Sequence, residues 1–343
     1  MLAAGYSVHA QDKGIEVRLS GQINRAILRA DDGGQEDWFN VDNDNSSTRF
    51  RFDAAGNVRP GMRAGILFEV EYQSNPSNVV NFVTRQASPS LDERHMDIFV
   101  NGGWGMLRLG QGDGAANGAA EVDLSGTSVA HYSETTGVGG GFLYRNSAGV
   151  LTSSSIGTTL ANQDFESRYD RLLYQSPVFS GFVAETSWGN KATDIFELAL
   201  RYSGKLDAAL GTLAGALGYS REDAVPGGVD DKIFGGSISW LHSSGMNLTF
   251  AHTNRDLPGR EGKFTYLKAG YKFNNRHAAS VDFGQGDDQE AGGDEATMVG
   301  LGYVYTPIAW AEVFGLIKRH DLDRPGTSLH DINLAMIGSR VKF

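Results

Sequence analysis

Hydrophobic and polar residues alternate with a period of two along most of the chain, and amphipathic helical spacing is hard to find. Residues 48–53, Thr-Arg-Phe-Arg-Phe-Asp, show the pattern almost without interruption. Alternation of this kind is typical of strands with two different faces. It predicts sixteen strands, over residues 15–28, 46–54, 62–72, 93–100, 105–111, 167–175, 180–188, 194–202, 210–219, 232–242, 245–253, 263–273, 276–284, 296–304, 309–318 and 329–343.

The predicted connections fall into two alternating classes. One class is short and turn-like, as at residues 101–104 and 243–244. The other is mostly longer and polar, and only residues 189–193 break that trend; its long members are 29–45, 73–92, 112–166, 220–231, 254–262, 285–295 and 319–328. A closed antiparallel meander places all the short turns at one end, whereas a soluble sandwich has no reason to sort its loops in this way.

The width of such a barrel decides which face is apolar. Sixteen strands enclose a space too wide for side chains to fill, so the inner face meets water. The alternate positions that carry charged residues in the first strands then face inward. They include Arg18, Arg49, Arg51, Arg63, Glu69 and Glu71. The opposite face is aliphatic and aromatic, which a bilayer requires on the outside of a barrel. We therefore predict an all-β fold, a transmembrane antiparallel up-and-down β-barrel of sixteen strands.

Aromatic residues at the strand ends support this orientation. On the apolar parity, they mark the ends near the short turns (Tyr202, Trp240, Tyr271, Tyr303 and Phe343) and the ends near the long loops (Tyr72, Trp188, Tyr219 and Phe283). Two aromatic girdles are typical of the two lipid–water interfaces.

Composition narrows the remaining choices. The chain has 343 residues with 30 basic and 41 acidic side chains, a net charge of −11, and no cysteine. An acidic chain without basic clusters disfavours nucleic-acid binding, and the lack of cysteine excludes disulfides and thiol chemistry. Residues 1–10 are interpreted as the remnant of an export signal or, alternatively, a disordered N-terminus. Residues 11–343 then form a single barrel domain.

The longest connection, residues 112–166, carries the most distinctive chemistry. Its only basic residue is Arg145, and its six acidic residues are Asp113, Glu121, Asp123, Glu134, Asp164 and Glu166. If this loop folds into the lumen, its acids, with Glu121, Asp123 and Glu134 as the candidates, face a wall made of Arg18, Arg49, Arg51, Arg63, Arg94 and Arg108. A transverse field at a constriction would filter solutes by size and charge. The alternative is a loop that projects outward, with the arginines solvated or paired with Glu69 and Glu71.

Several segments, in order along the chain, carry a family resemblance. They are Leu19-Ser20-Gly21-Gln22, Ser47-Thr48-Arg49-Phe50, residues 103–110 (Gly-Trp-Gly-Met-Leu-Arg-Leu-Gly), residues 174–182 (Tyr-Gln-Ser-Pro-Val-Phe-Ser-Gly-Phe) and the terminal Ser339-Arg340-Val341-Lys342-Phe343. In these segments the chain resembles the general diffusion porins of Gram-negative outer membranes, especially the alphaproteobacterial type.

This resemblance implies an outer-membrane homotrimer that lets small hydrophilic solutes diffuse passively and contacts lipid and lipopolysaccharide. It also implies that the third long loop forms the constriction and that the second loop latches onto a neighbouring subunit. Arg49 and Arg94 match wall positions of such constrictions, and Glu121 and Asp123 fall in the loop. The loop signature Pro-Glu-Phe-Gly-Gly of enterobacterial relatives is absent, so the carboxylate nearest the gap is left open.

Other functions find less support in the sequence. We expect no catalytic residues, because the eight histidines are scattered and none has a serine elbow or metal-ligand spacing nearby. We expect no cofactor; Asp42 and Asp44 are weak candidates for Ca²⁺, in a turn that lacks the later residues of a calcium loop. The acidic loop favours mild cation preference. The alternatives are a substrate-specific porin with a solute-binding constriction, and a barrel that acts as an adhesin or scaffold.

Overall fold

The computed structural model of the chain describes residues 7–10 and 14–343. The expected signal remnant or disordered N-terminus over residues 1–10 falls outside the described residues except for Ser7–Ala10, which form strand β1. Strand β1 pairs antiparallel with the start of β2, as Val8 opposite Val17 shows.

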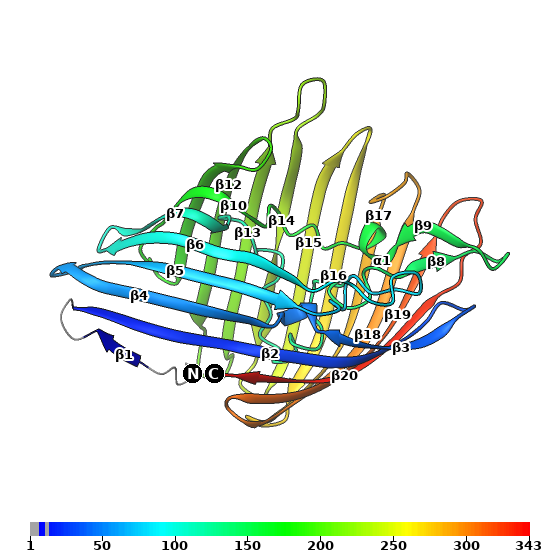
Figure 1. Ribbon diagram of the computed structural model, residues 1–343, viewed down its shortest axis with the longest axis horizontal. Helices are drawn as coiled ribbons and strands as arrows, with labels where there is room; N and C mark the ends of the chain where they lie inside the picture. The colour runs from blue at the N-terminus through cyan, green and yellow to red at the C-terminus, as the bar shows by residue number, and fades with distance from the viewer. Residues whose placement is uncertain (1–6, 11–13) are drawn as a thin grey trace.

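The described chain is built almost entirely from strands (Figure 1). They are β1 (Ser7–Ala10), β2 (Ile15–Asp31), β3 (Glu36–Asp42), β4 (Arg49–Arg59), β5 (Met62–Gln73), β6 (Ser90–Gly102), β7 (Gly105–Asp113), β8 (Leu143–Arg145), β9 (Leu151–Ser155), β10 (Arg168–Gln175), β11 (Phe182–Asn190), β12 (Asp194–Lys205), β13 (Thr212–Glu222), β14 (Asp231–Leu241), β15 (Met246–Leu257), β16 (Arg260–Lys272), β17 (His277–Asp287), β18 (Glu295–Ile308), β19 (Ala311–Asp323) and β20 (Ile332–Lys342). The helical elements are the 3₁₀ turn Asp44–Ser46 and α1 (Ile156–Thr159). No helix among the described residues is long and apolar enough to cross a membrane.

Sixteen of these strands form the barrel wall, namely β2, β4–β7 and β10–β20. Each pairs antiparallel with its neighbours, and β20 closes the ring against β2, where Ile27 lies opposite Ile337. Closure leaves no unpaired wall edge, which a bilayer requires because hydrocarbon offers no hydrogen bonds. The predicted sixteen-stranded antiparallel barrel is confirmed. Strand β3 pairs with the far end of β2, and β8 and β9 form a separate hairpin.

Several predicted boundaries differ from the structure, and two of these differences have clear local reasons. The second wall strand begins at Arg49 instead of residue 46, because Asn43 caps the 3₁₀ turn and its side chain accepts the amide hydrogen of Asn45. The long connection predicted over residues 254–262 is a two-residue turn between β15 and β16. Polar residues on both faces hide the alternation there, although Arg255 still pairs with Gly262.

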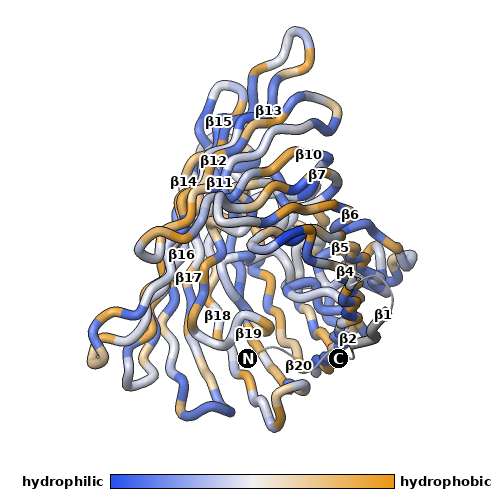
Figure 2. The backbone as a smooth tube through the Cα atoms, turned by 90° about the vertical axis from the view of Figure 1, so that its left-hand side faces the viewer, coloured by the Kyte–Doolittle hydropathy of each residue, from blue (hydrophilic) through white to orange (hydrophobic). Residues whose placement is uncertain are grey.

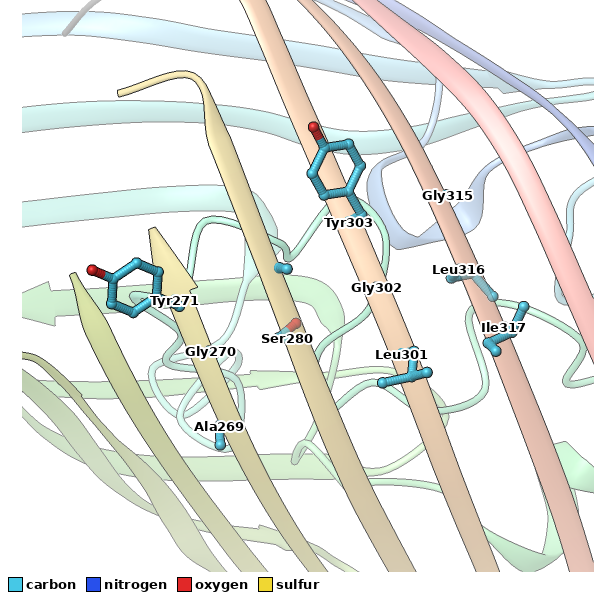
Figure 3. A pocket seen from close by; sticks show the side chains of 11 residues that line it. Ala269, Gly270, Tyr271, Ser280, Leu301, Gly302, Tyr303, Gly315, Leu316 and Ile317 are labelled. Carbon is cyan, nitrogen blue, oxygen red and sulfur yellow. The ribbon is translucent and has the colours of Figure 1, made fainter. Parts of the chain in front are cut away.

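Hydrophobic and hydrophilic residues alternate along the wall strands (Figure 2), and the two faces differ in exposure. Apolar side chains such as Ile23, Ile66 and Leu301 are exposed on the outside, whereas Glu69 and Asp97 are buried on the inside. Between β16 and β19 the outer face holds a shallow apolar groove lined by Tyr271, Leu301, Tyr303 and Ile317 (Figure 3). The predicted assignment of apolar residues to the outside therefore agrees with the exposed surface.

Candidate functional site

The connection between β7 and β10, residues 114–167, lies inside the ring of strands (Figure 1). The backbone amides of Val122 and Leu124 donate hydrogen bonds of 2.8 and 2.9 Å to the hydroxyls of Ser237 and Ser239 on β14. Both serines are buried, whereas Ile238 between them is exposed on the outer face. Of the two alternatives for this loop, the structure therefore shows the inward path.

A buried ion pair fixes the middle of the loop to the wall. The Lys268 ammonium on β16 donates to the Asp123 carboxylate and to the His131 carbonyl, both at 2.7 Å. The Lys268 side chain is fully buried, so both bonds are shielded from water. Asp123, expected to face the arginine wall, instead holds the loop in place. The His131 ring reaches β17, where its Nδ1 lies 2.8 Å from the Asp282 carboxylate.

Glycine on β18 makes room for this histidine. A Cβ atom at Gly302 would lie 2.2 Å from Nε2 of His131, and one at Gly300 would lie 2.3 Å from the Asp282 carboxylate. Such distances are far below a normal nonbonded contact, so the wall accepts the loop only where it carries no side chain. The glycines of β18 thus leave the space that the His131 side chain of the loop and its partner Asp282 occupy.

The second half of the loop packs on an apolar part of the inner wall. Phe142, Ile156 and Leu160 belong to the same buried cluster as Met298 and Phe314 of the wall. This packing fills the lumen beside β18–β20. A polar cavity of about 320 Å³ remains on the opposite side of the lumen. It lies between the start of the loop at Gly114 and Asn117, called the loop root, and strands β4–β7 and β10–β12.

The loop presents an acidic face made of Glu121, Glu134 and Asp164, with Asp44 close by. Burial raises the pKa of Asp164 to about 7, even though the amides of Gly118 and Ala120 donate hydrogen bonds to its carboxylate. Burial, together with the neighbouring charge of Asp164, also holds the pKa of Glu121 well above its ordinary value. Asp164 therefore changes its protonation state near neutral pH.

Asp44 is influenced both by the acidic face and by the arginine side of the lumen, which consists of Arg49, Arg51 and Arg94. Burial raises the pKa of Asp44 to about 6, and the charge of Glu134 acts in the same direction. A hydrogen bond of 2.7 Å from Gln73 and the charge of Arg94 act against this rise. Asp44 therefore lies within range of the charges of both Glu134 and Arg94.

The arginine side is already partly neutralised. Arg94 donates to Glu69 at 2.6 Å and to Glu71 at 2.7 Å. Arg49 lies 3.8 Å from the same Glu69, and Arg51 makes a bidentate bond to Asp53. Pairing with Glu69 and Glu71, considered above as an alternative, thus coexists with the inward loop.

The other predicted arginines lie elsewhere on the inner wall. Arg18 and Arg63 both approach Glu16, at 3.9 and 3.2 Å, toward the short-turn end of the strands. Arg108 lines the polar cavity, 3.6 Å from Asp97. The structure therefore joins Arg49 and Arg94 at Glu69, with Asp44 within range of Arg94, and it leaves Arg18 and Arg63 apart from them.

Sequence reasoning missed several charged groups on the inner wall. Arg340 on β20 pairs with Glu312 and donates to the Ser46 hydroxyl at 2.7 Å. Arg201 on β12 pairs with Glu185 and donates to two carbonyls at the loop root. Alternation in the last segment, Arg-Val-Lys-Phe, already places Arg340 among the inward positions. The same alternation also identifies Arg201, but it has to be followed into strands beyond the fifth.

The two weak calcium candidates have partners within the protein. Asp42 accepts the amide of Thr48 at 3.0 Å, and Asp44 accepts from Gln73. Across residues 7–10 and 14–343, no three or more acidic or histidine side chains gather in a way that would hold a metal ion.

Comparison with known proteins gives a consistent result. A sequence family described as Gram-negative porin matches residues 1–307. No curated protein sequence matches the chain.

Among solved structures, the anion-selective porin from Comamonas acidovorans is similar at 16% identity, with a TM-score of 0.70 over 96% of this chain and 100% of that one. Salmonella typhi OmpF, in complex with daunomycin, shares 11% identity with a TM-score of 0.66 over 98% and 100%. The trimer form of Vibrio cholerae OmpT shares 15% identity with a TM-score of 0.60 over 96% and 100%.

Proposed function

The chain belongs to the family of Gram-negative porins, and from this premise we propose that solutes cross its lumen through the gap between the acidic loop face and the arginine side. The protein is an outer-membrane barrel and serves as a diffusion channel for small hydrophilic solutes and ions. Asp44, in the turn before β4, carries the proposal, because the charge of Glu134 on the inward loop and that of Arg94 on the wall both act on it. Opposed charges across a narrow aqueous gap orient dipolar solutes and filter them by charge.

We propose a mild preference for cations. Arg94 is shared between Glu69 and Glu71, so its positive charge is largely balanced within the wall. Asp44 forms no ion pair with any residue of the described chain, and its side-chain hydrogen bond comes from the neutral amide of Gln73. The field in the gap is therefore net negative when the acidic face is ionised. The preference stays mild because Arg49 has only a 3.8 Å contact with Glu69.

Reversal potentials test this assignment. In a KCl gradient across a planar bilayer at pH 8, we expect the unaltered protein to favour K⁺, and Glu134→Gln to shift the potential toward anion preference. Glu261→Gln is a matched control, because it removes the same charge from an exposed position next to the β15–β16 turn. Clear anion preference of the unaltered protein, or equal shifts in both variants, would contradict the assigned gap.

We further propose that three copies assemble as a homotrimer, as the trimer form of the Vibrio protein suggests. In this chain the second loop, residues 74–89, packs on its own barrel: Val80 and Phe82 join the buried cluster, and Arg85 pairs with Asp37. Val79 and Val83 remain exposed on the same loop and offer apolar contacts for a neighbouring subunit. Cross-linking in detergent and analysis of the products by size tests for the trimer.

A further inference from the structure

The polar cavity at the loop root contains one arginine that differs from the others. Four arginines line it, against the carboxylates of Asp113 and Glu185: Arg51, Arg108, Arg171 and Arg201. Three of the four are fixed by hydrogen bonds to the protein. Arg171, for example, donates to the carbonyls of Gly110 and Asp113 and to the Asp97 carboxylate.

The side chain of Arg108 makes no hydrogen bond to any described residue. The nearest carboxylate oxygen, Oδ1 of Asp97, lies 3.6 Å from its Nη1, beyond the length of a good charged hydrogen bond. The charge of Asp97 is already used at closer range, because its Oδ2 accepts from Arg171 at 2.9 Å. The guanidinium N–H groups of Arg108 are therefore available to donate hydrogen bonds to a group from outside the protein.

The surroundings of Arg108 are apolar, although the cavity is polar as a whole. Leu173 and Phe99 lie directly opposite Arg108 on the two neighbouring strands, so their side chains share its face. Met106, two residues earlier on β7, also lines the cavity. A guanidinium beside three apolar side chains suits a ligand that has both a carboxylate and a hydrocarbon part, since an inorganic anion gains nothing from the apolar side chains.

Buried polar atoms at the same cavity also lack partners. Nδ1 of His95, a residue that is 8% exposed, and Oδ1 of Asp97 have no hydrogen-bond partner within the described part of the chain. The His95 ring lines the cavity, but these two atoms are themselves enclosed. They therefore mark an unsatisfied polar region next to the cavity and not a direct contact for a solute.

We propose that this cavity is a binding site for short-chain organic carboxylates on their way through the channel, with Arg108 holding the carboxylate and Leu173 and Met106 contacting the chain. A volume of about 320 Å³ is the space of ~10 water molecules, which admits a six-carbon carboxylate. The inference rests on the proposed channel function and deepens it, because it names the solute class that the lumen retains.

Single-channel current recording with hexanoate tests the site. We expect hexanoate added to the bath to block or slow the current in a saturable way at millimolar concentration. Hexanamide, which has the same chain and no charge, and acetate, which has the charge and no chain, are expected to have little effect. Arg108→Gln is expected to raise the half-blocking hexanoate concentration about tenfold or more, as loss of a charged hydrogen bond implies.

Two further variants separate the site from general charge effects. Arg63→Gln removes the same charge from a half-exposed arginine outside the cavity, and we expect its half-blocking concentration to stay within twofold of the unaltered protein. Leu173→Thr is expected to weaken the hexanoate block about threefold and to leave acetate unchanged. Because the Arg108 side chain makes no hydrogen bond to the described chain and the substitution leaves the backbone ladder in place, Arg108→Gln should keep its folded mobility on unheated gels.

The outcomes distinguish this inference from the channel assignment. Absence of any conductance in folded protein would overturn the channel and with it the site. Conductance that hexanoate does not change, block by hexanamide at the same concentration, or equal block of Arg108→Gln and the unaltered protein would overturn only the carboxylate site.

Discussion

Lys268 gives the sharpest test of how the loop is held inside the barrel. The substitution Lys268→Met removes the ammonium that donates at 2.7 Å to both Asp123 and the His131 carbonyl, and it leaves a buried carboxylate without its charge partner. Breaking a buried pair in this way costs about 3–5 kcal/mol. The wall strands keep their own hydrogen bonds, so we expect this cost to appear as easier local opening of the loop and not as unfolding of the barrel.

Hydrogen exchange measures that opening. A cost of ~3 kcal/mol corresponds to about a hundredfold faster exchange, since 1.36 kcal/mol is a factor of ten. We expect the increase at the amides of Val122 and Leu124, which donate to Ser237 and Ser239, in protein reconstituted in detergent micelles. Amides in the centre of β14 are expected to exchange at their former rate.

Two variants complete the test. The double variant Lys268→Met with Asp123→Asn removes both charges, and we expect it to exchange more slowly than Lys268→Met alone because no unpaired charge remains. Lys205→Met is a matched control at an exposed lysine near the end of β12, and it should leave the loop unchanged. If Lys268→Met leaves exchange at residues 122–131 unaltered, the ion pair does not hold the loop and the reasoning is refuted.

Further predictions concern pH and packing. Lowering the pH from 8 to 5 protonates Asp164, whose pKa is about 7, and Asp44, whose pKa is about 6. The cation preference measured by reversal potential should therefore fall as their negative charge is lost, and Asp164→Asn should remove the part of this change near pH 7. A preference that is constant from pH 8 to 5 would contradict this prediction. Gly302→Ala places a methyl group 2.2 Å from the His131 ring and should displace the loop, at a cost of about 1–3 kcal/mol, and alter single-channel conductance. Gly315→Ala, on the outer face with its nearest contact at 3.6 Å, should leave conductance unchanged, and equal behaviour of the two variants would refute the packing argument.

The barrel was predictable because one physical requirement acts on every strand. Apolar residues must face lipid and polar ones the lumen, so alternation appears in each segment from β2 to β20 and identifies all sixteen wall strands. The prediction failed where that requirement stops. Beyond the apolar band, the β15–β16 hairpin is polar on both faces, and strand and loop look alike in the sequence.

The partners of individual charges were harder to predict. Parity placed Arg49 inward but gave no depth along the strand, so Arg18 and Arg63 seemed equivalent to it. Strict alternation groups Arg94 with the outward Met96 and Ile98, and Arg94 reaches Glu69 only because the β5–β6 pairing shifts register there. The role of Asp123 depends on Lys268, which lies 145 residues away in the chain. Such a contact is set by the path of the loop across the lumen, and neither local periodicity nor spacing records that path.

Single-channel conductance of the purified protein in a planar lipid bilayer tests the central claim most directly. The account predicts stable, ohmic steps on the order of a nanosiemens, which grow in proportion to salt concentration as ions move through a wide aqueous lumen. A protein that inserts into the bilayer with its barrel folded, yet carries no current at any salt concentration, would contradict it.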